Sequence, residues 1–300
     1  MKSLSVFNKN AWFAGLTLKG FLLMLVFAAA SCSSDVDFGE QYKKTIYIVN
    51  ANNLLHSQEY FYGEENKLAF SVYCASSEPG TRDVTVRLQI DPRVLDSLNT
   101  LSLYENALYV DKVILPANRY QISGELEVII RAGEQYGILE IPFNSEGLDP
   151  DIAYALPVSI VSNDAGYDIN PEMNSVVSEI RMNNKYSGDF VGTSTESPTA
   201  IRPVQISSKA ISINSIRLPI HNLSDEGEGD IDTHFMLLTI SADGIVSIAP
   251  WRNAEVVDLG GSFYDEVRQL FELHYRFTDD AGKIFTVTEK ITNIYAPIIQ

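Results

Sequence analysis

The chain has 300 residues, and an apolar content of 45% with ordinary amounts of glycine and proline is typical of a globular protein with one large or two ordinary domains. The formal net charge of −17 at pH 7 argues against nucleic acid and anionic lipid headgroups as partners. It favours neutral ligands or cations.

Residues 1–31 are typical of an export signal. A basic segment ends at Lys19, the apolar core FLLMLVFAAA follows, and small residues come directly before Cys32. This apolar core is too short to hold the protein in a bilayer as a transmembrane anchor. We therefore predict that residues 1–31 are a signal peptide.

Cys32 completes the segment AASC, which resembles the lipobox of bacterial lipoproteins, where signal peptidase II cleaves before a cysteine that becomes lipidated. Ala29 stands where leucine is commoner. The alternative is an ordinary signal peptide that is cut near AAA, with an incidental cysteine. We predict lipidation of Cys32. Several acyl chains on one cysteine hold far more firmly than one myristoyl chain, so we expect membrane contact only through this anchor.

Residues 32–41 are predicted to form the lipidated cysteine and a tether. The segment SSDVDFGEQ after Cys32 is polar and acidic, and it resembles the surface-export signals of Bacteroidetes lipoproteins. The likeness implies a location at the outer membrane, on the cell surface rather than in the periplasm.

Residues 42–184 carry the pattern of a first β domain. In VTVRLQI (84–90) apolar and polar residues alternate, as in a half-buried strand. Residues 124–143 predict two strands around the turn RAGEQ, and residues 92–101 predict one short helix with Pro92 in its first turn. Because closely spaced strands dominate, we expect an antiparallel, immunoglobulin-like sandwich.

Cys74 ends the apolar, strand-like run FSVYC. If Cys32 is lipidated, Cys74 has no other cysteine in the chain with which to form a disulfide. We expect a buried thiol, because a reactive or metal-binding role would need neighbouring histidines or cysteines, and the sequence suggests none.

A domain boundary is predicted near RMNNKYSGDF (181–190), where polar residues interrupt the strand pattern. Residues 185–300 predict a second antiparallel β domain, either a sandwich or a small barrel. Hairpins are expected around ADG (242–244) and TDDAGK (278–283). In FELHYRF (271–277) the apolar residues alternate with polar ones, so one face of that strand should be buried.

The sequence contains no recognisable catalytic or metal-binding motif. The acidic run SDEGEGDID (224–232) could surround a hard cation, but its spacing does not match the twelve-residue calcium loop, so a solvated loop is favoured. Carboxylates crowded on one loop cannot flank a sugar as a glycosidase pair must. The four histidines are scattered, and no serine-hydrolase elbow or nucleotide-binding glycine motif occurs. We expect no metal, no cofactor and no catalytic residue.

Trp251 is the first of three aromatic candidates for sugar binding, because pyranose rings stack on flat aromatic faces beside polar groups. It is the only tryptophan left after removal of the signal peptide, and Arg252 and Asn253 follow it as polar neighbours. The alternative is a tryptophan that caps the core of its domain.

Phe263 and Tyr264 form the second aromatic candidate, and Tyr60 and Tyr62 in QEYFYGEEN (58–66) form the third. Three consecutive aromatic residues cannot all face inward from a strand, so at least one of residues 60–62 should be exposed. Exposed, tyrosine-rich loops serve protein contacts equally well.

The segments TIYIVNA, RAGEQYGILEIPF and YALPVSIVSND resemble the N-terminal β-sandwich domain of a family of Bacteroidetes surface lipoproteins. The same kind of domain precedes family-18 glycoside hydrolases, which are endo-β-N-acetylglucosaminidases. The segments YSGDFVGTS, DGIVSI and FELHYRF resemble the uncharacterised β domain that is often fused behind it. The resemblance implies glycan binding or presentation beside outer-membrane glycan importers and glycosidases. The acidic D-x-x-D-x-D-x-E motif of the hydrolases is absent, so their reaction is not implied.

The leading hypothesis is a non-catalytic surface lipoprotein that binds or presents an oligosaccharide or glycan within a glycan-utilisation system. The alternative is a structural or adhesive cell-surface protein whose β domains contact other proteins. An unrecognised hydrolase is the third possibility, and the missing catalytic motifs argue against it.

Overall fold

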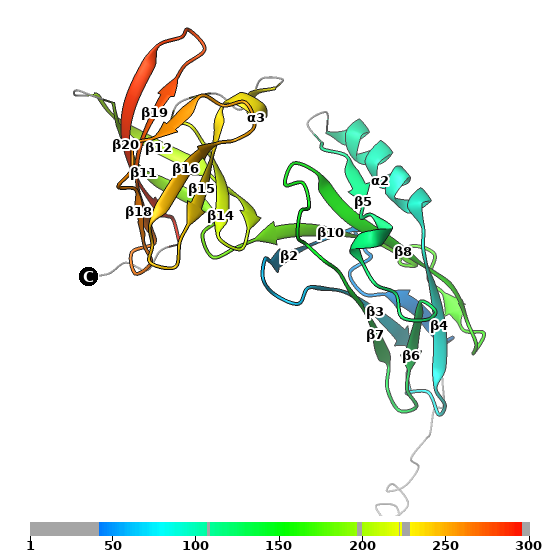
Figure 1. Cartoon of the computed structure of the whole chain (residues 1–300). Helices are drawn as coiled ribbons and strands as arrows, with labels where there is room; N and C mark the ends of the chain where they lie inside the picture. Colours follow the sequence, from blue (N-terminus) through cyan, green and yellow to red (C-terminus); the bar gives the residue numbers. More distant parts are fainter. Residues whose placement is uncertain (1–41, 107–108, 197–199, 222, 224–228, 296–300) are drawn as a thin grey trace, which may run out of the picture. The chain divides into compact units, whose positions relative to one another are not determined.

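Strands dominate the described part of the chain, which covers residues 42–106, 109–196, 200–221, 223 and 229–295 of a computed structural model (Figure 1). The prediction of an all-β protein with two sandwich-like domains is confirmed. The described residues from 43 to 295 belong to one compact unit. The predicted signal peptide, Cys32 and the tether lie outside the described residues. Within the described ranges, no helix has the length and apolar character that crossing a bilayer requires.

The N-terminal domain consists of two sheets. The first has four strands in the order β7-β3-β1-β9, and the second has the order β2-β10-β8-β4-β6 with β5 beside β8. Most neighbours are antiparallel, as predicted, but β1–β9, β2–β10 and β5–β8 are parallel, and each of these pairs is joined by a long crossover connection. The strands are β1 (Thr45–Ile48), β2 (Leu55–Phe61), β3 (Lys67–Ala75), β4 (Val84–Ile90), β5 (Lys112–Ile114), β6 (Glu127–Ile130), β7 (Tyr136–Pro142), β8 (Ala153–Asn163), β9 (Asp168–Ile169) and β10 (Ser175–Asn183), with a 3-10 turn η1 (Ala117–Arg119) after β5.

Alternating side chains build the core between these sheets. In β3, Leu68, Phe70 and Val72 point inward and are at most 2% exposed, whereas the residues between them face out. Cys74 continues the inward series and is buried, as predicted.

Helix α2 (Pro92–Glu105) packs on the six-stranded sheet near β5 and β8 (Figure 1). The Asp91 carboxylate accepts a hydrogen bond from the Arg93 backbone N–H and so caps the helix, while Pro92 occupies its first turn. Leu95 and Leu98 are buried against the sheet. The helix runs four residues beyond the predicted range of 92–101, because no glycine or proline stops it there.

Asn184 organises the turn between the two domains. Its side-chain amide donates hydrogen bonds to the carbonyl oxygens of Ser212 and Ser215, and its side-chain oxygen accepts from the backbone N–H groups of Tyr186 and Ser187. One buried asparagine thus fixes the path of the chain where β10 ends.

The C-terminal domain also consists of two sheets. One has the order β12-β11-β20-β19-β17 with β18 beside β19, and the other has the order β13-β14-β15-β16. Both predicted hairpin turns form, between β15 and β16 and between β19 and β20. The elements are β11 (Asp189–Glu196), β12 (Ala200–Ser207), β13 (Lys209–Ser212), β14 (Ser215–Pro219), the short helix α3 (Asp230–Thr233), β15 (Phe235–Ile240), β16 (Val246–Pro250), β17 (Val256–Asp258), β18 (Phe263–Asp265), β19 (Leu270–Thr278) and β20 (Ile284–Asn293).

Strand β19 shows how the pattern of the sequence fills this second core. Phe271, Leu273, Tyr275 and Phe277 are all buried, and the polar residues between them lie on the other face, as predicted. Strands β11 and β20 also approach closely at Gly192, where a Cβ atom would lie 1.9 Å from the Lys290 carbonyl oxygen. Only glycine fits at that position.

Candidate functional site

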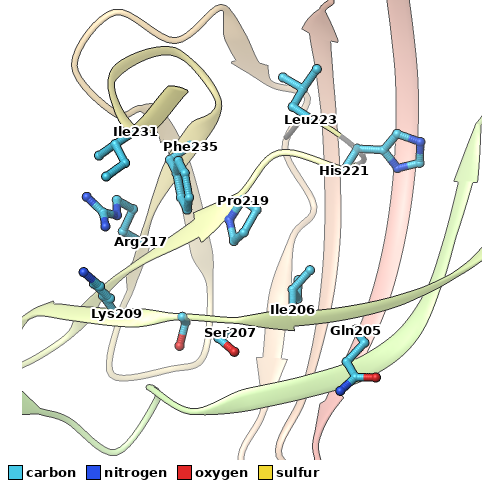
Figure 2. Close-up of a pocket in the computed structure, with 11 residues that line it drawn as sticks. Gln205, Ile206, Ser207, Lys209, Arg217, Pro219, His221, Leu223, Ile231 and Phe235 are labelled. Carbon is cyan, nitrogen blue, oxygen red and sulfur yellow. The ribbon is translucent and has the colours of Figure 1, made fainter. Parts of the chain in front are cut away.

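A pocket of about 490 Å³ opens in the C-terminal domain where the chain passes from β12 in one sheet to β13 in the other. Figure 2 shows Arg217 and Lys209 near one end of this pocket and His221 and Leu223 near the other. Its lining combines apolar surface with hydroxyl, amide and cationic groups. The lining residues are Gln205, Ile206, Ser207, Ser208, Lys209, Arg217, Pro219, His221, Leu223, Ile231 and Phe235.

Arg217 is the most deeply buried charge in the pocket wall. Its side chain is 2% exposed, and its Nη1 atom lies 2.6 Å from Asp151 Oδ1 and 2.8 Å from Oδ2. The guanidinium group also lies 4.8 Å from the centre of the Phe235 ring. A buried guanidinium needs such a carboxylate, because an unpaired charge in a protein interior is costly.

Trp251 lies against this arginine. The guanidinium groups of Arg217 and Arg252 both lie over its ring, at 5.2 and 5.3 Å from the ring centre. Arg252 also pairs with Asp151 at 3.1 Å and with Asp232 at 2.5 Å. The Trp251 ring is half-buried, and the guanidinium groups of both arginines lie over it.

Two buried N–H donors in this cluster have no acceptor among the described residues. They are Nε of Arg217, which lines the pocket, and Nε1 of Trp251 beside it. Buried N–H donors normally have a hydrogen-bond acceptor, so these two atoms favour a site that binds a ligand rich in oxygen acceptors.

His221 belongs to a buried polar chain at the other end of the pocket. Its Nδ1 lies 2.7 Å from Ser194 Oγ and its Nε2 lies 2.8 Å from Glu196 Oε1. The hydrogen bond with His221 lowers the pKa of Glu196 below its ordinary value, against a smaller opposing effect of burial. Serine, histidine and glutamate in this order resemble a hydrolase triad, but Ser194 has no exposed surface, so its hydroxyl cannot reach a substrate.

The predicted site residues fall in three different places. Trp251 and Arg252 belong to the arginine cluster, and the neighbouring Asn253 is exposed, with its backbone N–H bonded to the Asp232 carbonyl. Phe263 is 41% exposed, whereas Tyr264 is half-buried, with its ring 4.5 Å from that of Phe271. The structure therefore does not bring the second aromatic candidate to the pocket.

Tyr60 and Tyr62 do not form an exposed platform. Both are buried, at 5% and 8% exposure, whereas Phe61 between them is 41% exposed: Tyr60 packs in the core between the two sheets, and Tyr62 follows the last residue of β2. The expectation that at least one of the three is exposed is confirmed, but the exposed residue is Phe61. Tyr62 lines a second cavity of about 530 Å³, which shares Lys209 and Ile231 with the first.

The predicted acidic loop lies partly outside the described residues, since residues 224–228 are not described. Of its carboxylates, Asp232 pairs with Arg252, and Asp230 lies 3.6 Å from the His234 ring. The described residues hold no group of three or more side chains that could bind a metal ion.

Sequence reasoning missed Arg217, Lys209 and Asp151. Arg217 carried a usable signal, since it is one charge inside the apolar segment SIRLP of a buried strand. Asp151 carried none, because it comes from the loop before β8 and meets Arg217 only in the fold.

Two family models match the chain. One, described as an N-terminal domain, matches residues 42–166, and the other, described as a C-terminal domain, matches residues 174–292. The chain therefore contains both family domains in this order. No curated protein matches the sequence.

Several solved structures from Bacteroides share the fold. A protein of unknown function from Bacteroides ovatus has a TM-score of 0.61 at 16% identity, covering 84% of this chain and 93% of its own. A multidomain protein from the same species that includes DUF1735 has a TM-score of 0.59 at 17% identity, with the same coverage of 84% and 93%. An auxiliary nutrient binding protein from Bacteroides thetaiotaomicron has a TM-score of 0.54 at 17% identity, covering 81% of this chain and 92% of its own. None of these three is described as an enzyme.

Proposed function

We propose that this protein is a non-catalytic lipoprotein of the outer-membrane surface that binds glycan and presents it to an importer or a glycosidase. The signal-like residues 1–31 and Cys32 support the anchor. The fold shared with Bacteroides proteins, one of them described as an auxiliary nutrient binding protein, supports a role in nutrient capture. The relation to domains that precede family-18 glycoside hydrolases stays a prediction.

The pocket of the C-terminal domain is the observation that carries glycan binding. A sugar presents apolar C–H faces and a ring of hydroxyls, so it needs apolar side chains together with hydrogen-bonding groups. Phe235, Ile206 and Pro219 supply the first kind, and Lys209 and Arg217 supply the second. The volume of about 490 Å³ lies in the usual range for small-ligand sites.

The test is a glycan array on the soluble protein from residue 33 onward, followed by titration calorimetry on the best ligand. Ile206→Trp fills the pocket from the inward face of β12, where Figure 2 shows the Ile206 side chain directed toward Pro219, and should abolish binding there. Ile201→Trp is the matched control, since it introduces the same side chain on β12 at a position that is 68% exposed and does not line the pocket. No binding to any glycan, or equal binding by both variants, would contradict the pocket as the site.

A second candidate function is adhesion to another protein, and the edge strand β12 is the observation that favours it. Eight residues long and paired only with β11, it offers backbone groups to a partner strand. Pro203 in its middle lacks an N–H, which weakens such pairing. Glycan binding is therefore the better supported function.

A further inference from the structure

The outer face of the four-stranded sheet in the N-terminal domain carries three tyrosines in one row. Strand β1 turns Ile46 and Ile48 into the core and Tyr47 outward, and β3 turns Tyr73 outward in the same way. Tyr136 begins β7 and is 55% exposed. Alternation along each strand thus brings all three side chains to the same face.

The strand register aligns these tyrosines across the sheet. Tyr47 is the direct partner of Tyr73 in the β1–β3 pair, and Tyr73 is the direct partner of Tyr136 in the β3–β7 pair. Since neighbouring strands lie about 4.8 Å apart, this tyrosine row spans about 10 Å between its outer members. The Tyr47 and Tyr73 ring centres are 5.4 Å apart.

The middle ring of the row is held in place. The Tyr73 hydroxyl donates to Gln135 Oε1 at 2.9 Å, and the Gln135 amide donates to the Ser76 carbonyl oxygen at 3.1 Å. A ring that is already ordered loses little rotamer freedom when a ligand covers it.

The surroundings of the tyrosine row are small, polar or apolar, and carry no net charge. Ala69, Ser71 and Ala75 lie beside Tyr73 on the outer face of β3, and Ile138 follows Tyr136 on β7 at 53% exposure. The one pair of opposite charges among the outward residues of β3 and β7 is Lys67 with Glu140, at 2.8 Å. On a chain with a net charge of −17, such a neutral face suits a neutral partner.

We propose that the tyrosine row is a second glycan-binding surface, which stacks successive pyranose rings of a neutral, soluble polysaccharide chain. Aromatic rings repeated at strand spacing offer apolar faces to consecutive sugars, and their hydroxyls bond to sugar oxygens. The planes of the Tyr47 and Tyr73 rings differ by 44°, so a bound chain must twist from one ring to the next. This tilt selects a flexible single chain over the flat surface of crystalline cellulose. The inference goes beyond the pocket proposed above and does not depend on it.

The test is affinity electrophoresis of the protein from residue 33 onward in gels that contain mixed-linkage β-glucan, galactomannan, dextran or polygalacturonate, with microcrystalline cellulose in a pull-down. We expect retardation by at least one neutral polysaccharide, and neither retardation by anionic polygalacturonate nor pull-down by cellulose. Tyr136→Ala should weaken the affinity about 3- to 10-fold, and Tyr136→Trp should restore it. Tyr104→Ala removes a tyrosine that is 92% exposed on α2, away from this face, and should leave the affinity unchanged.

Several outcomes would overturn the inference. The first is that none of the neutral polysaccharides retards the protein. The second is that Tyr136→Ala binds as tightly as the parent protein. A change of sedimentation mass in Tyr136→Ala without a change in glycan affinity would instead identify the face as a self-association surface. Since Ile206→Trp closes only the pocket, loss of binding in that variant alone would support the pocket and contradict the tyrosine row. Thermal unfolding of each variant confirms that it is folded.

Discussion

Glu179 and Glu289 are the two buried glutamates among the described residues, one in each domain, and their surroundings differ in kind. Glu179 on β10 is 4% exposed and is surrounded by cations and donors. Lys112 Nζ lies 2.7 Å from one carboxylate oxygen, and Arg181 lies 3.1 Å from the other, which also accepts from the Ser57 hydroxyl. Burial by itself raises the pKa of Glu179, but the hydrogen bonds and positive charges together bring it below its ordinary value.

Glu289 on β20 has no cationic partner among the described residues. The Tyr275 hydroxyl donates to its Oε2 at 2.7 Å, and its Oε1 has no hydrogen-bond partner in that part of the chain. Burial raises the pKa of Glu289 to about 7, and the Tyr275 hydrogen bond is a smaller effect in the opposite direction.

The contrast shows that partners, rather than burial, decide whether a buried carboxyl is charged. Glu179 has a lowered pKa in the folded state, so its stabilising contribution is present above the ordinary pKa and is lost as the pH falls. Glu289 has a raised pKa, so its contribution is complete below 4.5 and is lost as the pH rises to about 7. The two domains should therefore respond to pH in opposite directions.

The largest expected effect is that of Lys112→Met on the N-terminal domain. The substitution leaves the Glu179 carboxylate buried with only the exposed Arg181 as a cation, and it should cost about 3 kcal/mol of unfolding free energy at pH 7. The loss should shrink toward pH 4, where Glu179 can take up a proton. Urea unfolding followed by circular dichroism measures it.

Lys67→Met is the matched control for this prediction. Lys67 and Glu140 form an exposed pair, with side chains 44% and 54% exposed, so losing it should change the unfolding free energy far less than Lys112→Met does. Equal losses in the two variants would show that the partners of Glu179 do not matter.

Glu289→Gln should remove most of the pH dependence of the C-terminal domain. Because the carboxyl keeps its proton in the folded state up to a pKa of about 7 and loses it near 4.5 when unfolded, the parent should lose about 3 kcal/mol of stability across that window. The glutamine variant should not. Trp251 fluorescence reports unfolding of this domain, since Trp251 is its only tryptophan.

Glu266→Gln serves as the control, because this carboxyl belongs to the same domain and is 74% exposed. The unfolding free energy of the Glu266→Gln variant should follow that of the parent protein at every pH. A Glu289→Gln profile that also follows the parent would mean that Glu289 is charged in the folded protein.

Side-chain alternation made much of this fold predictable. It placed β4 at Val84–Ile90, and it predicted which face of β19 is buried. It could also have revealed Glu289, which shares the inward face of β20 with Val287 and Ile291. The outward position of Tyr47 and Tyr73 is likewise readable from the pattern of each strand.

The pairing of distant segments was not predictable from local pattern. The parallel contact of β2 with β10, the meeting of Asp151 with Arg217 and the alignment of the tyrosine row all depend on strand register and loop paths. The same limit applies to Tyr60 and Tyr62 as binding candidates. Three adjacent aromatics require one outward residue, but they do not say which one.

Tyr275→Phe gives the smallest expected effect and sharpens the contrast between the two glutamates further. It removes the hydroxyl that donates to Glu289 Oε2 at 2.7 Å and leaves the ring in the core. We expect a loss of about 1 to 2 kcal/mol, because a buried acceptor then lacks its donor. Since this hydrogen bond lowers the pKa of Glu289, its removal should raise that pKa further, so the fall in stability should continue to a higher pH than in the parent. Unfolding titrations from pH 4 to 9 measure both effects. In the double variant with Glu289→Gln the shift along the pH axis should vanish, and its persistence there would mean that another group titrates in this core.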